Sequence, residues 1–194
     1  MKLCFATNNA HKLEEVEAAL SDGRIELVTL SDIGCHEELP ETGVTLEANS
    51  HQKAAYLYQH YGVNCFADDT GLEVTALSGE PGVYSARYAG PQRSATDNVQ
   101  LLLENLRDKT DRSAQFRAVF TLILNGVTQQ FEGIVAGQII DAPRGIEGFG
   151  YDPVFVPDGY ERTFGEMNLA EKNGISHRTR ALEKLVDYLQ KMGK

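Results

Sequence analysis

Two adjacent aspartates, in the sequence Asp68-Asp69-Thr70-Gly71, are the residues of this chain best suited to chemistry. They follow a short apolar run at residues 63–67, which indicates a buried strand of an α/β protein. An unpaired charge in a core is very costly, whereas α/β sheets carry ligands just beyond the carboxyl ends of their strands. A carboxylate pair where this strand ends could hold a divalent metal, activate water, or do both. The alternative is an Asx-type turn, because Asp, Thr and Gly are ordinary turn residues.

A second candidate is the segment Thr7-Asn8-Asn9-Ala10-His11-Lys12, where a strand is expected to pass into a helix. A helix N-terminus offers unpaired N–H groups and a partial positive charge, which both suit phosphate, and Lys12 could reach an anion there. The segment lacks the glycines of a Walker loop or a dinucleotide fingerprint. An ordinary Asn-capped helix with a solvated lysine explains the pattern equally well.

The polar loop at residues 31–43 contains three glutamates, Glu37, Glu38 and Glu41. Mg²⁺ usually takes only one or two protein carboxylates and completes its shell with phosphates and water. Glu41 together with Asp69 would match that habit. For Glu37 and Glu38, a solvated acidic loop is the simpler interpretation.

Two segments near the C-terminus could contact a planar base and a phosphate. The loop Phe149-Gly150-Tyr151-Asp152-Pro153 offers rings that could stack on a base, or rings that merely close the edge of the core. Lys172 and Ser176-His177-Arg178 surround the expected start of the last helix. Cations there are unfavourable unless an anion joins them, although a lone His or Arg on a helix is usually a surface or packing residue.

Hydrophobic periodicity predicts the elements that position these residues. We expect strands at 2–7, 25–30, 63–67 with an extension to 74, 114–124 and 127–140, and helices at 11–20, 46–61, 96–106 and from Ser176 onward. Thr45 and Thr96 are the expected N-caps, Gly62 the expected stop, and Asn125-Gly126 the hairpin turn. A Gly-, Pro- and Tyr-rich loop fills residues 77–93. This order predicts an α/β fold with a mixed sheet and helices packed around it.

Composition narrows the function classes. With 194 residues, 42% of them hydrophobic, we expect one domain over residues 1–194 with a substantial core. A net charge of −10 argues against nucleic-acid binding, and no apolar run approaches the roughly 20 residues of a membrane helix. The N-terminal apolar stretch is short for a signal peptide, so we expect a cytoplasmic protein. Cys4 and Cys65 fall in predicted strands and are expected to be buried free thiols.

Six segments, in this order and at this spacing, resemble the inosine triphosphatase-like, noncanonical purine nucleoside triphosphate pyrophosphatases. The resemblance spans residues 7 to 178. It is carried by Thr7-Asn8-Asn9-Ala10-His11-Lys12, Glu41-Thr42-Gly43, Asp68-Asp69-Thr70-Gly71, Pro81-Gly82-Val83-Tyr84-Ser85-Ala86-Arg87-Tyr88, Gly148-Phe149-Gly150-Tyr151-Asp152-Pro153 and Ser176-His177-Arg178.

The resemblance implies Mg²⁺-dependent hydrolysis of inosine, deoxyinosine or xanthosine triphosphate (ITP, dITP or XTP) to a monophosphate and pyrophosphate. Such hydrolysis removes these nucleotides before polymerases can use them. It further implies an elongated α/β fold, with a central mixed sheet and two lobes flanking a cleft, and a homodimer.

The same resemblance assigns roles. It gives triphosphate binding to Thr7, Asn8, Asn9, Ala10, His11 and Lys12, the metal to Glu41 and Asp69 with Asp68 in support, proton acceptance to Asp69, and a substrate contact to Thr70. It gives the base to Phe149, Gly150, Tyr151 and Asp152, and further base and phosphate contacts to Lys172, His177 and Arg178. Glu47 and Asn49 are additional candidates. In the implied mechanism, Mg²⁺ holds water near the α-phosphorus and Asp69 takes its proton.

Three alternatives are weighed against this hypothesis. Maf-like nucleotide pyrophosphatases resemble this fold, but the Ser-His-Arg and Phe-Gly-Tyr-Asp segments argue against them. A non-catalytic nucleotide sensor would often have lost a metal carboxylate, whereas Glu41, Asp68 and Asp69 are all present. A nucleic-acid-binding module fits the negative net charge poorly.

Overall fold

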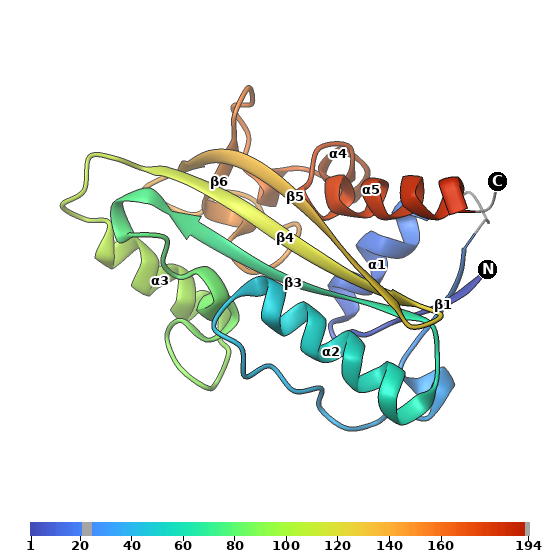
Figure 1. Cartoon of the computed structure of the whole chain (residues 1–194). Helices are drawn as coiled ribbons and strands as arrows, with labels where there is room; N and C mark the ends of the chain where they lie inside the picture. Colours follow the sequence, from blue (N-terminus) through green and yellow to red (C-terminus); the bar gives the residue numbers. More distant parts are fainter. Residues whose placement is uncertain (21–24, 193–194) are drawn as a thin grey trace. The chain divides into compact units, whose positions relative to one another are not determined.

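The computed structural model describes residues 1–20 and 25–192, and the chain forms two compact units (Figure 1). The first unit contains Met1–Asp69, Ala118–Gly133 and Arg178–Lys194, and the second contains Thr70–Arg117 and Ile134–His177. The single functional domain expected over residues 1–194 stays a prediction.

The strands form a mixed six-stranded sheet in the order β2-β1-β3-β4-β5-β6, which confirms the predicted fold class. Strand β1 is parallel to both β2 and β3, with Cys4 opposite Cys65, and β5 is antiparallel to β6. The strands are β1 (Lys2–Phe5), β2 (Glu26–Val28), β3 (Cys65–Val74), β4 (Ser113–Leu124), β5 (Val127–Ile139) and β6 (Phe155–Pro157). The α-helices are α1 (Ala10–Ala19), α2 (Leu46–Tyr61), α3 (Ala95–Asn105), α4 (Leu169–Asn173) and α5 (His177–Met192).

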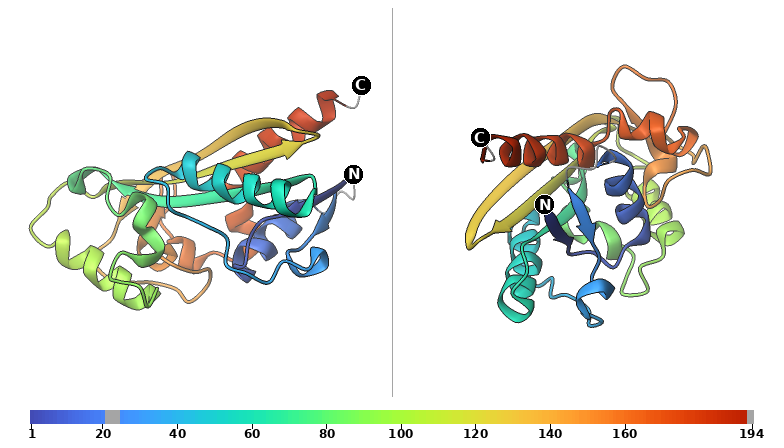
Figure 2. Two further views of the ribbon diagram at one scale, coloured as in Figure 1. Left: turned by 60° about the horizontal axis from the view of Figure 1, so that its bottom comes forward. Right: turned by 90° about the vertical axis from the view of Figure 1, so that its right-hand side faces the viewer.

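Alternation along the strands divides the core of the first unit into two layers. Leu3 and Phe5 face one side of β1 and pack with residues of α1 and α5. Cys4 and Ala6 face the other side and pack with residues of α2. Figures 1 and 2 show α2 on the face of the sheet opposite α1 and α5. The first unit is therefore a sheet covered by helices on both faces.

The second unit has its own core around the far half of β3, helix α3 and strand β6. Leu72, Leu102 and Phe116 are buried in it, and the rings of Phe116 and Phe155 meet edge to face at 4.7 Å. This core supports the loop that carries the predicted base-binding residues.

The structure confirms the caps of α2 and the hairpin turn, which were predicted from a few neighbouring residues. Helix α2 has the predicted bounds, with its N-cap at Thr45, whose Oγ1 accepts from Ala48 N at 3.1 Å, and its stop at Gly62 with φ 63°. The hairpin between β4 and β5 turns at Asn125 and Gly126, whose φ angles of 50° and 81° are those of a type I′ turn.

Three expectations about boundaries are wrong. Strand β3 continues from Cys65 to Val74, so the strand that was expected to end at residue 67 includes Asp68 and Asp69. The carboxylate pair is therefore part of a strand and not of an Asx turn. Helix α3 is capped by Ser94, whose side chain accepts from Asp97 N at 3.2 Å, because the helix begins at Ala95 and places Thr96 inside its first turn. Strand β2 is shorter than residues 25–30.

Cys4, Cys35 and Cys65 are free and buried, which confirms the expected thiols of Cys4 and Cys65. Burial raises the pKa of both Cys4 and Cys65 to about 12, so they stay protonated at neutral pH. Among the described residues, no helix combines the length and apolar character needed to cross a membrane.

Candidate active site

Each unit gathers part of the predicted site. The first unit contains the segment from Thr7 to Lys12 together with Glu41, Asp68, Asp69 and Arg178, and the second contains Thr70, Phe149, Gly150, Tyr151, Asp152, Lys172 and His177.

The end of β1 places the carboxylate pair at a position suited to ligand binding although its own strand continues. Strand β1 stops at Phe5, and Ala6 N donates to Phe66 O of β3 at 2.8 Å. Strand β3 runs on, so Asp68 and Asp69 lie just past the carboxyl end of a parallel neighbour. Ligands of α/β sheets bind at such ends.

The N-terminus of α1 starts from the same end of β1. Asn9 caps it, because its Oδ1 accepts from the backbone N–H groups of His11 at 3.0 Å and Lys12 at 3.3 Å. Asn8, Asn9, Ala10 and His11 are exposed. The Asn-capped helix is thus confirmed, and its start is open to an anion.

Asp68 is fully buried and is held by two cations. Lys12 Nζ lies 3.0 Å from each carboxylate oxygen, and Arg178 Nε lies 3.5 Å from Oδ2. The Lys12 side chain is only 14% exposed, so the interpretation as a solvated lysine is wrong. Burial lowers the pKa of Lys12, and the charge of Asp68 opposes that shift.

Arg178 has a second carboxylate partner that the sequence analysis missed. Its guanidinium pairs with Glu15 of α1, and both side chains are almost fully buried. Glu15 follows Lys12 by three residues, so the two share one face of α1. The sequence feature that could have indicated this ion pair is the position of Glu15 beside the apolar Val16, on the side of α1 that is buried.

Asp69 has a different environment from that of Asp68. Its Oδ2 accepts from Asn49 Nδ2 at 3.1 Å, and Asn49 Oδ1 accepts from Gly43 N at 2.7 Å. Burial raises the pKa of Asp69, although Lys53 and Lys12 act in the opposite direction. A raised pKa makes a carboxylate a stronger proton acceptor. The candidate Asn49 therefore ties Asp69 to the loop that follows Glu41.

Glu41 forms an ion pair with Lys53, a buried lysine of α2 that the sequence analysis also missed. Lys53 Nζ lies 2.5 Å from Glu41 Oε1. Burial alone would raise the pKa of Glu41, but the charge and hydrogen bond of Lys53, together with the charge of Lys12, outweigh it, and the net shift is downward. Burial lowers the pKa of Lys53, and the charges of Asp68, Asp69 and Glu41 reverse that shift. Glu41 and Lys53 are therefore both charged at neutral pH.

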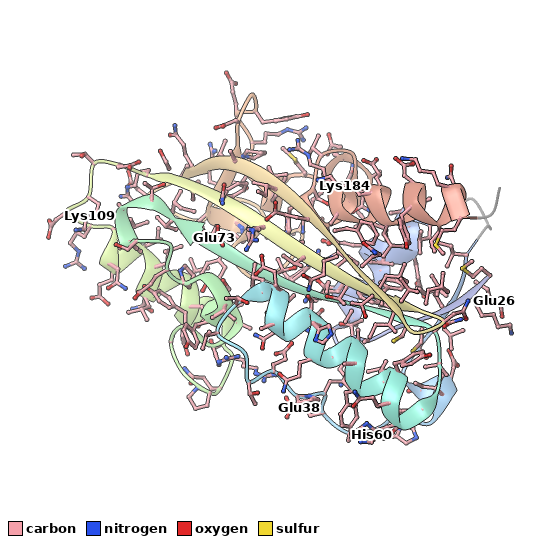
Figure 3. All side chains as sticks on the ribbon, viewed as in Figure 1. Glu26, Glu38, His60, Glu73, Lys109 and Lys184 are labelled. Carbon is pink, nitrogen blue, oxygen red and sulfur yellow. The ribbon has the colours of Figure 1, made fainter. Side chains whose placement is uncertain are left out.

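The other residues of the acidic loop behave as expected. Glu38 is exposed on the loop (Figure 3). The exposed Glu37 accepts hydrogen bonds from Tyr61 at 2.6 Å and Tyr56 at 3.1 Å. Glu47, the other additional candidate, accepts a hydrogen bond at its backbone oxygen from Gln130 at 3.0 Å.

The donor set fits Mg²⁺ as a partly protein-bound ion. In the described part of the chain, no three His, Cys, Asp or Glu side chains form a cage for a metal. Mg²⁺ does not require one, since it is usually held by one or two carboxylates and by substrate phosphates. Glu41 and Asp69 supply two such carboxylates, whereas Asp68 already accepts a hydrogen bond from Lys12 and forms an ion pair with Arg178.

In the second unit, Asp152 organises the loop that includes Phe149. Its Oδ2 accepts from Phe149 N at 2.8 Å and from Lys172 Nζ at 2.7 Å, and Lys172 Nζ lies 4.9 Å from the centre of the Phe149 ring. Tyr151 is buried, with its hydroxyl donating to Ser85 O at 2.8 Å. Tyr151 therefore closes the core, and Phe149, which is half-buried, is the ring available for stacking.

His177 and Thr70 complete the second set. The His177 ring is 3% exposed and stacks on Phe116, with 4.8 Å between centroids and 11° between planes. Thr70 follows Asp69 in β3 and is half-buried. The substrate contacts expected of these two residues stay predictions.

Comparison with known proteins places the chain among close relatives. The model of the Ham1 family matches residues 3–188. A dITP/XTP pyrophosphatase from Flavobacterium psychrophilum is 50% identical over 190 residues, which cover 98% of this chain and 100% of the relative. One from Porphyromonas gingivalis is 50% identical over 189 residues, which cover 97% of each chain.

Solved structures agree in fold. A HAM1 protein from Coxiella burnetii matches with a TM-score of 0.90 and 37% identity, over 98% of this chain and 99% of that one. The Staphylococcus aureus Ham1 protein matches with a TM-score of 0.89 and 36% identity, over 99% and 100% of the two chains.

Proposed function

Because the chain belongs to the Ham1 family, we propose that it is a nucleoside triphosphate pyrophosphatase acting on noncanonical purine nucleotides. Two relatives that are 50% identical to this chain, and that it matches over their full length, carry the name dITP/XTP pyrophosphatase. The substrates we assign are ITP, dITP and XTP, with Mg²⁺ as cofactor and a monophosphate and pyrophosphate as products. The family membership favours this function over a Maf-like enzyme or a nucleic-acid-binding module.

One observation supports this proposal above the others: a buried cluster in which carboxylates face lysines beside an exposed helix N-terminus. Lys12 and Lys53, together with the start of α1, supply positive charge for the triphosphate. Glu41 and Asp69 are the residues that would hold Mg²⁺. When bound there, Mg²⁺ would offset charge on the phosphate oxygens.

The chain's own contribution to hydrolysis is a proton acceptor of fixed orientation. A water oxygen attacks the α-phosphorus, the bond from that phosphorus to the bridging oxygen breaks, and pyrophosphate leaves. Asp69 takes the proton of the attacking water, and Asn49 keeps its carboxylate oriented through Oδ2. Lys12 and Lys53 stabilise charge on the departing group.

Base selection is assigned to the second unit. Phe149 offers the stacking surface, and Asp152 fixes the loop by accepting from its backbone. Donors that pair with a 6-oxo group would be left unpaired by the 6-amino group of adenine. Lys172 and His177 are the donors that we assign to this task in that unit. The proposal includes a homodimer, which the family resemblance implies, and the cytoplasmic location expected from the sequence.

The test is a product analysis of the parent protein and of a variant that lacks the proposed proton acceptor, Asp69. The protein is incubated with Mg²⁺ and, separately, with ITP, XTP, ATP and GTP, and the products are identified. We expect monophosphate and pyrophosphate from ITP and XTP only. Asp69→Asn should abolish turnover, whereas Asp108→Asn, at an exposed aspartate, should retain it. Orthophosphate as the product, or near-full activity of Asp69→Asn, would refute the assignment.

A further inference from the structure

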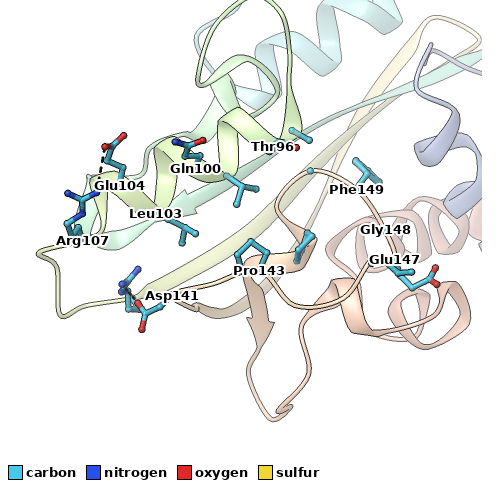
Figure 4. A pocket seen from close by; sticks show the side chains of 16 residues that line it. Thr96, Gln100, Leu103, Glu104, Arg107, Asp141, Pro143, Glu147, Gly148 and Phe149 are labelled. Carbon is cyan, nitrogen blue, oxygen red and sulfur yellow. Dashed lines mark hydrogen bonds and ion pairs between the residues drawn. The ribbon is translucent and has the colours of Figure 1, made fainter.

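A groove in the second unit is lined in part by Phe149 and Gly150 of the proposed base site, but by none of the other residues assigned to that site. It has a volume of about 850 Å³ and runs between α3 and the loop at residues 141–150 (Figure 4). Tyr151, Asp152, Lys172 and His177 do not line it. Its volume falls within the range of small-molecule sites.

The middle of the groove is apolar. Leu103 of α3 forms one wall, and Pro143 and Phe149 belong to the opposite wall (Figure 4). Ile146, on the same loop, is 96% exposed. An apolar body in the groove would cover these surfaces and remove them from water.

Arg112 provides an unsatisfied donor at the groove. Its Nη1 is buried and makes no hydrogen bond within the described structure, while its Nη2 pairs with Asp141. The Asp141 side chain is 86% exposed, so the carboxylate that pairs with Arg112 lies largely in water. A buried donor without an acceptor is costly, and a charged acceptor satisfies it better than a neutral one.

The other charges of the lining limit the ligand further. Glu104, Asp141 and Glu147 line the groove together with two guanidinium groups, those of Arg107 and Arg112. Three carboxylates against two guanidinium groups disfavour a polyphosphate, which separates this groove chemically from the triphosphate site. A ligand with an apolar body and a single anionic oxygen acceptor would cover the apolar middle and satisfy the Arg112 donor, and it would carry less negative charge into the groove than a polyphosphate.

We infer that this groove is a second small-molecule site, for a flat apolar ring system that carries one carboxylate bound by Arg112 Nη1. An occupant would also touch the loop that presents Phe149, where Gly148 and Gly150 have φ angles of 71° and 62°. Any effect on nucleotide selection rests on the proposed function, whereas binding itself does not.

Isothermal titration of the full chain with 2-naphthoate tests the site, with the uncharged naphthalene-2-carboxamide as the matched probe. We expect 2-naphthoate to bind at millimolar concentration or below. Arg112→Gln should weaken its binding by about tenfold or more, because a hydrogen bond to a charged group is lost. The carboxamide should bind more weakly than the carboxylate and should be less sensitive to Arg112→Gln.

Three further variants keep the test decisive. Gln100→Trp fills the groove from α3 and should abolish binding, whereas Glu183→Trp, at an exposed position that does not line the groove, should leave it unchanged. Asp141→Asn removes a competing carboxylate and should retain or strengthen binding. The inference is overturned if 2-naphthoate does not bind, or if Arg112→Gln and Gln100→Trp bind it as the parent does. The titration does not measure nucleotide turnover, so a failure of this inference can be distinguished from a failure of the proposed function.

Discussion

The ion pairs around Asp68 should make this residue a large contributor to the stability of the first unit. Asp68→Asn keeps the size of the side chain but leaves Lys12 and Arg178 facing a neutral amide, although the three side chains are 0%, 14% and 2% exposed. Removing one partner of a buried ion pair costs about 3–5 kcal/mol. That is a large fraction of the roughly 5–15 kcal/mol that holds a domain folded.

The loss can be measured as a shift in urea unfolding followed by far-ultraviolet circular dichroism. With a denaturant slope of about 2 kcal/mol/M, 3–5 kcal/mol lowers the unfolding midpoint by about 1.5–2.5 M. The control is Glu26→Gln, which breaks the pair of Lys2 with Glu26, whose side chains are 72% and 60% exposed. We expect no measurable shift for that variant, because water already solvates both charges.

A double variant identifies the cause of the shift. If unpaired cations destabilise Asp68→Asn, adding Lys12→Met removes one of them and should recover part of the lost midpoint. The reasoning fails if Asp68→Asn unfolds at the same urea concentration as Glu26→Gln. It also fails if the double variant is less stable than Asp68→Asn by the full cost of a second independent substitution.

Other expectations concern pH dependence and backbone space. Hydrogen bonds from Tyr61, from the backbone and from Tyr56 lower the pKa of Glu37 from 4.5 to about 2, so its contribution to stability is complete above pH 4.5 and disappears as the pH falls to about 2. The melting temperature of Glu37→Gln should therefore fall less than that of the parent between pH 5 and pH 2.5, roughly the window of this titration. Lys53 lowers the pKa of Asp69, so Lys53→Met should move the acid limb of kcat/KM to higher pH; a limb moved to lower pH would contradict the role of Asp69 as base. A Cβ at Gly43 would lie 2.8 Å from Asn49 Oδ1, so Gly43→Ala should lower kcat/KM by about 10- to 100-fold through displacement of Asn49, and unchanged kinetics would show that this contact is dispensable.

The features predicted correctly from sequence are those encoded within a few neighbouring residues. Helix α2 carries its own start at Thr45 and its own stop at Gly62, and the hairpin turn is contained in two residues. Strand β3 shows the opposite case. Asp68, Asp69 and Gly71 have the composition of a turn, yet they remain in a strand because β3 continues beside β4 after β1 has ended, and this pairing is decided by residues far along the chain.

The candidate site divides in the same way. The oxygen-rich motifs were visible from residue types alone, but the carboxylate partners of the buried cations Lys53 and Arg178 are brought near only by folding. Tyr151 has the same chemistry as an exposed stacking ring, and only its burial beside Ser85 excludes that use. Burial is a property of the assembled core and cannot be predicted from one loop.

The ion pair of Glu15 with Arg178 joins residues 163 positions apart, and this separation has a consequence for the synthesis of the chain. The ribosome adds Glu15 and Asp68 long before it adds Arg178, so folding of the incomplete first unit would bury two carboxylates without their guanidinium partner. Its last segment, Arg178–Lys194, closes the unit only when translation is nearly complete. A product that stops before α5 should therefore fail to fold and be degraded, instead of accumulating as an inactive protein that still binds nucleotides.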